Sequence, residues 1–308
     1  MNVPDALAGR LQMNEPLRRH SYIGIGGRAL YYAAVRTVAE LAAARQFAAD
    51  GGWPLFVIGM GTNVLVADQG VDGLVAVLEG DDFDGCRAGD GTLDAAAGCS
   101  LARAMNTAVA AGLAGLEVLA GIPSTVGGAL WMNAGGRHGT VTDRLETVTV
   151  MDPLGAVRAC GRDELAFGYR QSSFAEGTII LGARFKCERV VPEMLAVRRD
   201  AILADKARTQ PLDARSLGCV FRNPAGRSAG ELIDRCGLKG TRVGDMAVST
   251  LHANFIVNAG QGRSRDMVAL MELIHARVRE AHGVDLAPEI VFFGDCGWTH
   301  GSVPAACR

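Results

Sequence analysis

The chain has 308 residues, of which 49% are hydrophobic and 21% are charged, and its formal net charge is -2. This length favours two or three domains of about 100 to 150 residues, and the composition excludes a disordered chain. The small net charge gives no electrostatic reason to expect nucleic acid or an anionic membrane as a partner.

No export signal or membrane span is indicated, because no cationic start precedes an apolar run and no stretch of about 18 uncharged apolar residues occurs. We therefore expect a cytoplasmic protein without membrane insertion. Eight cysteines are scattered without a CxxC pair or a Cys/His cluster, which predicts mostly free thiols and no metal site. No heptad seam is present, and we expect a monomer or a weak homodimer.

The first segment has the pattern of a small α/β unit. Apolar spacing predicts a helix in "TVAELAAARQFAADGG", which is followed by a strand at residues 55–58. The strand leads into "GMGTNVL", residues 59–65, where a glycine-rich turn offers unpaired backbone amides to an anion. The turn lacks the features of a P-loop and of GxGxxG, so these residues alone leave a phosphate site and a simple turn equally open.

The second segment, from about residue 81, combines helices and strands around a glycine-rich loop. Ser100 is a candidate N-cap for a helix to Val109, and strand-like runs follow at 148–151 and 178–185. In "AGIPSTVGGALWMNAGGRHG", glycines flank a short apolar helix whose N-terminus, near Ser124 and Thr125, is predicted to attract a phosphate. Tight packing of this helix against glycine is the alternative.

The third segment contains a predicted helix at about 193–207 and a second one in "SRDMVALMELIHARVREAHG". In the second helix, apolar residues recur at helical spacing and Gly283 provides the stop signal. We interpret its Met and Ile stripe as core packing rather than as a cofactor site.

Three further residues could carry chemistry. Arg170 in "FGYRQSSF" could clamp a carboxylate, although most arginines are surface residues. Glu289 in "APEIVFFG" is either a surface charge or an inward-facing acid with a shifted pKa. Cys219 in "SLGCVFRNP" is either a buried apolar residue or a proton donor, because a thiol with a free pKa of about 8.5 is protonated at neutral pH.

A series of segments resembles the UDP-N-acetylenolpyruvoylglucosamine reductase (MurB) family from about Leu17 to Gly294. In chain order the segments are "SYIGIGG", "GMGTNVL", "GLEVLAGIPSTVGGALWMNAGG", "YRQSSF", "SLGCVFRNP", "AGELIDRCGLKG", "VSTLHANFIVN" and "APEIVFFG". The resemblance implies an α+β protein with an FAD-binding fold of the vanillyl-alcohol-oxidase/p-cresol-methylhydroxylase type. Two FAD-binding subdomains, 1–79 and 80–190, would precede a C-terminal α+β substrate-binding domain, 191–308, whose strand near 288–294 packs back on the FAD domains.

The resemblance also assigns roles to residues. Arg170, Cys219 and Glu289 occupy the catalytic positions, with cysteine where serine is more usual. The positions that match substrate-binding residues are Tyr169, Asn223, Lys239 and His252, the last being glutamine in some members. The positions that match the site of a non-covalent FAD are Gly59, Gly61, Thr62, Asn63, Val64, Leu65, Gly121, Ile122, Pro123, Ser124, Gly127, Gly128, Asn133, Ala134 and Gly135.

The implied reaction is a two-step reduction in peptidoglycan synthesis, which serves cell-wall biogenesis, cell shape and cell division. NADPH reduces FAD, and hydride then passes from N5 of the flavin to C3 of the enolpyruvyl group of UDP-N-acetylglucosamine enolpyruvate. Arg170 would stabilise the developing charge with the help of Glu289, and Cys219 would protonate C2 to give UDP-N-acetylmuramate. The chain looks like the family's second type, which lacks a tyrosine-bearing loop and leaves the pocket more open.

Two other functions fit parts of the sequence. The first is an oxidase with the same flavin fold, which "GCVFRNP", "GLKG" and "HANFIVN" disfavour. The second is a non-enzymatic nucleotide-binding module, which would be colourless, whereas the reductase would be yellow.

Overall fold

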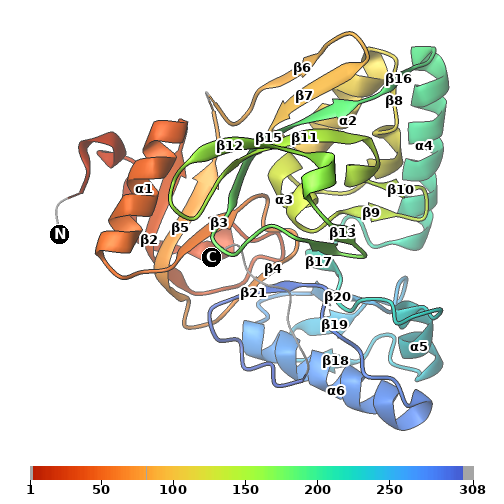
Figure 1. Ribbon diagram of the computed structural model, residues 1–308. Helices are drawn as coiled ribbons and strands as arrows, with labels where there is room; N and C mark the ends of the chain where they lie inside the picture. The colour runs from red at the N-terminus through yellow and green to blue at the C-terminus, as the bar shows by residue number, and fades with distance from the viewer. Residues whose placement is uncertain (1–2, 81, 301–308) are drawn as a thin grey trace.

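The computed structural model describes residues 3–80 and 82–300. Figure 1 shows three units: α1 with a first sheet at the left, a second sheet at the upper right, and a third sheet with α6 at the lower right. Short 3₁₀ helices connect parts of these units: η1 (Asp5–Leu7), η2 (Leu17–Arg19), η3 (Glu117–Leu119), η4 (Val141–Arg144) and η5 (Arg162–Glu164).

The first sheet has the strand order β1-β2-β5-β3. Its strands are β1 (Leu11–Pro16), β2 (Arg28–Val35), β3 (Leu55–Ile58) and β5 (Val71–Leu78). β1 is antiparallel to β2, whereas β2 and β3 both run parallel to β5. The predicted helix is α1 (Val38–Asp50), which packs on β2 and β5; its N-cap, Thr37, accepts a hydrogen bond from the amide of Glu40.

The second sheet is antiparallel, with the order β12-β11-β15-β7-β6. Its strands are β6 (Cys86–Ala88), β7 (Thr92–Ala96), β11 (Leu145–Met151), β12 (Val157–Gly161) and β15 (Ile179–Lys186). Two helices accompany it, α2 (Leu101–Ala110) and α3 (Val126–Trp131). The hydroxyl oxygen of Ser100 accepts from the amide of Arg103, which confirms the predicted N-cap of α2. Short ladders complete the unit: β8 (Leu113–Ala114) with β16 (Glu188–Arg189), β9 (Gly135–Gly136) with β10 (Gly139–Thr140), and β13 (Phe167–Gly168) with β14 (Gln171–Ser172).

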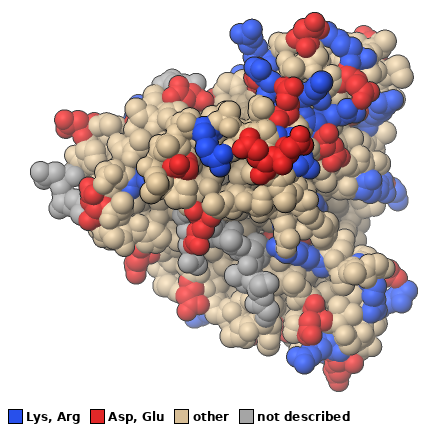
Figure 2. All heavy atoms as spheres, viewed as in Figure 1, with Lys and Arg blue, Asp and Glu red and all other residues tan. Residues whose placement is uncertain are grey.

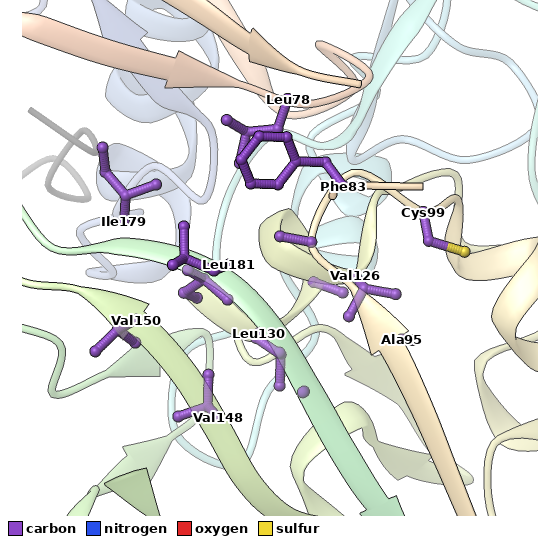
Figure 3. Close-up of a cluster of buried hydrophobic side chains, with 14 of the residues drawn as sticks. Leu78, Phe83, Ala95, Cys99, Val126, Leu130, Val148, Val150, Ile179 and Leu181 are labelled. Atoms are coloured by element: carbon purple, nitrogen blue, oxygen red, sulfur yellow. The ribbon is translucent and has the colours of Figure 1, made fainter. Parts of the chain in front are cut away.

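A continuous apolar core joins the first two units. Leu78 of β5 belongs to the same buried cluster as Leu181 of β15 and Leu130 of α3, and Figure 3 shows these side chains in that cluster. Because burial of apolar area is the main favourable term in folding, this shared core holds the two units together.

Helix α4 (Pro192–Thr209) packs on α2 and η3 rather than on the third sheet. Leu195 and Ile202 of α4 are buried in a cluster with Met105 and Val109 of α2. The domain limits stay predictions, and this packing favours a boundary after Thr209 rather than at residue 191.

The third unit is a sheet with the order β17-β20-β19-β18, together with two helices. Its elements are β17 (Ser216–Cys219), α5 (Ala229–Arg235), β18 (Arg242–Val243), β19 (Met246–Val248), β20 (Phe255–Asn258) and α6 (Ser264–His282). The predicted stripe on α6, which includes Met267, Met271 and Ile274, is fully buried in the core of this unit, so the core-packing interpretation is confirmed. Gly283 ends α6 in the left-handed conformation, as the sequence predicts.

The end of the chain returns to the first two units. β21 (Val291–Phe293) runs parallel to β4 (Val64–Val66), the strand that follows the glycine-rich turn. The residues after Gly294 carry no motif that predicts a role. In the structure Cys296 bonds through its thiol to the carbonyl of Leu65, and Trp298 packs near Phe221; Cys307 lies outside the described residues.

In residues 3–80 and 82–300 no helix is both long and apolar enough to cross a membrane, and no cluster of His, Cys, Asp or Glu could hold a metal ion. On the face seen in Figure 2, acidic and basic side chains are intermixed without a broad area of one sign.

Candidate active site

A cavity of about 760 Å³ lies where the three units meet. Its walls come from the turn after β3, the segment that leads into α3, the turn between β13 and β14, strand β17, and the residues before β21. Segments separated by more than 200 residues therefore face one another across a single cavity.

The turn at residues 59–63 forms one wall from backbone rather than from side chains. Gly61 has a φ of +63°, and a Cβ at this position would overlap the carbonyl oxygen of His20. The amides of residues 60–63 have no hydrogen-bond acceptor in the described chain. The hydroxyl of Thr62 donates to the carbonyl of Pro123 at 2.5 Å, which ties the turn to the opposite wall. These free amides favour the anion-binding interpretation of the turn.

The N-terminus of α3 is occupied by the protein itself. The amide of Val126 donates to the carbonyl of Cys99, that of Gly127 to the carbonyl of Ala97, and that of Gly128 to the hydroxyl of Thr125. The first three amides of α3 therefore have acceptors within the protein, and the phosphate site near Ser124 and Thr125 stays a prediction. A Cβ on Gly127 would lie 3.0 Å from the Cβ of Ala97, so close packing explains this glycine.

Most residues predicted to bind FAD line the cavity. These are Gly59, Gly61, Thr62, Asn63, Val64, Gly121, Ile122, Pro123, Ser124, Gly127, Gly128, Ala134 and Gly135. Two do not line it. Leu65 is fully buried in the core, and Asn133 donates to the carbonyl of Gly168 while its amide oxygen accepts from the hydroxyl of Thr142. The side chains of Leu65 and Asn133 therefore stabilise the walls.

Arg170 enters the cavity from the turn between β13 and β14, where its φ of +56° is rare for a residue other than glycine. Its Nε donates to Oε1 of Glu289 at 2.6 Å, and one Nη donates to the carbonyl of Gly135 at 2.9 Å. Burial works to lower the pKa of this guanidinium, but the Glu289 carboxylate outweighs it and the pKa is raised. The arginine therefore stays charged in a largely enclosed position.

Cys219 and Glu289 are brought together by backbone pairing. The amide of Glu289 donates to the carbonyl of Val220 at 2.8 Å, next to the end of β17. Burial raises the pKa of Glu289, while Arg170 opposes the shift. Burial, and then the nearby Glu289 carboxylate, raise the pKa of the Cys219 thiol to about 12. Both side chains line the cavity with Arg170, so Glu289 is an inward-facing acid and Cys219 is a protonated thiol.

The residues matched to substrate binding divide into two groups. Asn223 and His252 line the cavity, and burial lowers the pKa of His252, which favours a neutral ring. Tyr169 lies outside the cavity wall, where its ring covers the guanidinium of Arg170 and its hydroxyl oxygen accepts from the amide of Asn223 at 3.4 Å. Lys239 also lies outside the wall and forms an ion pair with Asp234 at 2.7 Å.

Sequence reasoning missed Lys206, near the C-terminal end of α4, which lines the cavity. Its Nζ donates to the carbonyl of Ala120 at 2.6 Å, and its side chain packs where Gly121 leaves space. Burial, and then the charge of Arg170, lower the pKa of Lys206 to about 8. The only signal in the sequence was the glycine at 121, and its partner 85 positions later could not be inferred from spacing.

Residues 210–293 match the family model described as UDP-N-acetylenolpyruvoylglucosamine reductase, C-terminal domain, and residues 29–161 match an FAD binding domain. The UDP-N-acetylenolpyruvoylglucosamine reductase of Synechococcus sp. (strain RCC307) is 39% identical over 300 residues, which cover 96% of this chain and 97% of the relative. That of Heliobacterium modesticaldum (strain ATCC 51547 / Ice1) is 38% identical over 299 residues, or 94% of this chain and 92% of the relative. The chain belongs to the UDP-N-acetylenolpyruvoylglucosamine reductase family.

A crystal structure of the family member from Thermus caldophilus, titled UDP-N-acetylenolpyruvylglucosamine reductase (MurB), matches with a TM-score of 0.80 and 38% identity. The match covers 92% of this chain and 98% of that one. The predicted α+β fold, an FAD-binding region followed by a C-terminal domain, is thereby confirmed.

The cavity fits the FAD that this family's fold implies. Its volume of about 760 Å³ lies within the range of about 300 to 1,000 Å³ that is usual for cofactor sites. The FAD-binding match includes the wall segments 59–65 and 121–135, with the free amides of residues 60–63 among them. The C-terminal match includes Cys219 and Glu289. The boundary between the two matched regions therefore crosses the cavity.

Proposed function

We propose that this protein is a UDP-N-acetylmuramate dehydrogenase, which uses NADPH and FAD to reduce UDP-N-acetyl-3-O-(1-carboxyvinyl)-glucosamine to UDP-N-acetylmuramate in peptidoglycan synthesis. One observation carries the proposal: a single cavity joins the walls of the FAD-binding region to Arg170, Cys219 and Glu289. The two relatives from Synechococcus and Heliobacterium modesticaldum are named as reductases of UDP-N-acetylenolpyruvoylglucosamine, which supports the proposal. Because the reaction uses a nucleotide sugar and NADPH, we expect it to take place in the cytoplasm.

The residues that would hold FAD are those of the two glycine-rich walls. The amides of residues 60–63 are free to donate to its diphosphate, and Gly61 keeps side-chain atoms out of that space. When bound, FAD would supply the chemistry that the protein lacks, accepting hydride from NADPH and delivering it to C3 of the enolpyruvyl group.

Arg170 would stabilise the negative charge that builds up on the substrate carboxylate as hydride adds. Its Nε and one Nη are held by Glu289 and by the carbonyl of Gly135, which fixes the plane of the guanidinium. The other Nη has no acceptor in the described chain and is available to the substrate. A preorganised cation in an enclosed site costs little reorganisation during the reaction, and such donors contribute about 2.7–4 kcal/mol to catalysis.

Cys219 would deliver the proton to C2. Burial and the Glu289 carboxylate keep the thiol protonated throughout the neutral pH range. The thiol therefore carries its proton when the substrate binds. The guanidinium of Arg170 favours the thiolate that remains after proton transfer, since it lowers the pKa of Cys219, whereas burial and Glu289 raise it. Solvent would then return the proton before the next turnover.

Lys206 would add a second cation for an anionic ligand. It lines the same cavity as Arg170, and no carboxylate pairs with it in the described chain. NADPH and the UDP-sugar both carry a diphosphate, so a partly desolvated ammonium suits either one. The two cations are close enough that Arg170 lowers the pKa of Lys206.

The proposal is tested with purified protein in three measurements. The absorbance spectrum should show a bound flavin, NADPH should bleach it, and the enolpyruvyl sugar nucleotide should restore it with formation of the lactyl ether, detected by mass. A colourless protein that cannot be loaded with FAD would support a nucleotide-binding module instead. Restoration of colour by oxygen but not by the enolpyruvyl sugar would support an oxidase.

A further inference from the structure

Two arginines in the cavity wall are each paired with a carboxylate. Within the described chain, Arg170 pairs with Glu289 at 2.6 Å and Arg137 pairs with Asp205 at 2.6 Å, and all four residues line the cavity. We call the first the inner pair and the second the mouth pair. The reaction proposed for this cavity uses only the inner pair.

The mouth pair joins two elements where the cavity opens to solvent. Arg137 lies in the turn between β9 and β10, and Asp205 lies near the C-terminal end of α4; Figure 1 shows this hairpin beside α4. The side chains of Arg137 and Asp205 are 67% and 27% exposed, compared with 18% and 12% for Arg170 and Glu289. Solvent therefore reaches the mouth pair far more than the inner pair.

The difference in exposure decides which pair can open. Separating a buried ion pair leaves uncompensated charges in a poorly solvated place, so the inner pair should stay closed. An exposed ion pair adds little stability, because water solvates both groups when they separate. The mouth pair can therefore exchange partners at a small cost in free energy.

Asp205 has a second partner that would remain if Arg137 moved away. Arg208, three residues further along α4, donates to Oδ1 of Asp205 at 2.9 Å, whereas Arg137 donates to Oδ2 at 2.6 Å. The two arginines thus bind different oxygens of one carboxylate. Release of Arg137 would leave Asp205 paired with Arg208.

A phosphate group can compete with Asp205 for Arg137, because a guanidinium binds phosphate through two parallel charge-assisted hydrogen bonds. Lys206 lines the same cavity and supplies a further cation for such a ligand. We propose that Arg137 exchanges Asp205 for a phosphate group of the nucleotide that enters the cavity; the choice of nucleotides, NADPH and the UDP-sugar, rests on the proposed function. Asp205 holds the guanidinium at the mouth until the ligand arrives.

The first test titrates UDP and, separately, NADP⁺ into the FAD-loaded protein by calorimetry. Arg137→Ala should weaken the binding of at least one of them about tenfold, the loss expected for one charge-assisted hydrogen bond. A loss with UDP alone assigns Arg137 to the sugar nucleotide, a loss with NADP⁺ alone assigns it to the dinucleotide, and a loss with both means that it serves each in turn. Unchanged affinities for both would overturn the proposal.

The matched control for this test is Arg189→Ala. Arg189 is 60% exposed and pairs with Asp90 at 2.8 Å, and neither residue lines the cavity. This substitution should change the affinity for neither ligand. An equal loss in Arg189→Ala and Arg137→Ala would mean that any exposed arginine attracts the ligand by its charge, which would also refute the exchange.

The second test uses Asp205→Asn, which should act in the opposite direction. Arg137 is then no longer held by a carboxylate, so the ligand that depends on Arg137 should bind about two- to fivefold more tightly. In the Arg137→Ala background the same substitution should bring no gain, because no partner exchange remains. An equal gain in both backgrounds would mean that Asp205 repels the ligand directly. That result, or no gain in either background, would contradict the exchange.

Failure of the exchange can be told apart from failure of the proposed function. If the wild-type protein bound neither UDP nor NADP⁺, the proposed function would fail and the exchange with it. If the wild-type protein bound both, and the variants at residues 137 and 205 bound them equally well, only the exchange would fail.

Discussion

The end of the cavity at residues 59–63 is built from backbone, whereas the end at Arg170, Cys219 and Glu289 is built from ionisable side chains. Gly61 and Gly218 make the contrast concrete. Both have a positive φ, +63° and +75°, yet a Cβ on Gly61 would overlap a backbone carbonyl, whereas one on Gly218 would meet nothing within 4 Å. At the backbone end, FAD binding requires a turn without side-chain atoms in the way. At the other end, catalysis requires the guanidinium, thiol and carboxyl groups themselves.

The two ends should therefore respond to opposite kinds of substitution. Added atoms should damage the backbone end by displacing FAD or by straining the fold. Exchanges of functional groups should leave FAD bound and affect only the chemical step.

Arg170→Lys should lower the rate of flavin reoxidation by the enolpyruvyl substrate roughly 100- to 1,000-fold, because a lysine cannot bond Glu289, Gly135 and the substrate at once. Single-turnover absorbance measures this rate. Arg208→Lys, on the exposed side of α4, is the matched control and should leave it unchanged. An equal, small effect of both exchanges would mean that Arg170 is not at the reaction centre.

Gly61→Ala should destabilise the protein by about 2–3 kcal/mol and weaken FAD binding, because the new Cβ overlaps the carbonyl of His20 and φ is positive. Urea unfolding and FAD titration measure the two effects. Gly237→Ala is the control, since φ there is +69° but a Cβ would meet nothing within 4 Å. It should cost only about 1–2 kcal/mol and leave FAD affinity intact. Equal FAD affinities in the two variants would argue against the backbone cradle.

With saturating enolpyruvyl substrate, the rate of flavin reoxidation in the wild type should remain constant from about pH 7 to about pH 10. The donor must be protonated, and its folded-state pKa is raised to about 12, so protonation is lost only as the pH rises toward that value. A thiol with the ordinary pKa of about 8.5 would instead lose roughly tenfold per pH unit above that point. The Cys219→Ser variant, whose hydroxyl does not titrate in this range, provides the comparison curve.

Lys206→Met should raise KM for the UDP-sugar roughly tenfold at neutral pH, about the contribution of one charge-assisted hydrogen bond. In the wild type KM should rise as the pH increases through about 8, because the ammonium loses its proton there. Lys206→Arg keeps the charge and should remove this pH dependence. If the rise near pH 8 persisted in Lys206→Met, another group would be responsible.

Local elements could be predicted from the sequence because their signals are local. The N-cap at Ser100, the buried stripe on α6 and the stop at Gly283 all follow from side chains within one or two turns of each other. The α3 N-terminus shows the limit of this reasoning. The helix N-terminus near Ser124 and Thr125 could be predicted, but the carbonyls of Ala97 and Cys99, which accept from its first amides, belong to an earlier segment of the chain.

The site could be predicted only in part. Arg170, Cys219 and Glu289 were each ambiguous on their own, because inward and outward orientations have the same local pattern. The family resemblance identified all three, and the pairing of residues 287–289 with 220–222 shows why Cys219 and Glu289 meet. Lys206 could not be predicted as a cavity residue, because its position depends on the packing of α4 against the second unit. Such a long-range contact leaves no periodic pattern in the sequence.

The central claim is that Cys219 gives the proton while the two-electron chemistry belongs to the flavin. Stopped-flow absorbance of FAD-loaded Cys219→Ala tests it most directly, with Cys219→Ser as the control. We predict that reduction by NADPH proceeds as in the wild type, whereas reoxidation by the enolpyruvyl sugar nucleotide slows by about 100- to 10,000-fold in the alanine variant and far less in the serine variant. Reoxidation of the alanine variant at the wild-type rate would contradict the claim.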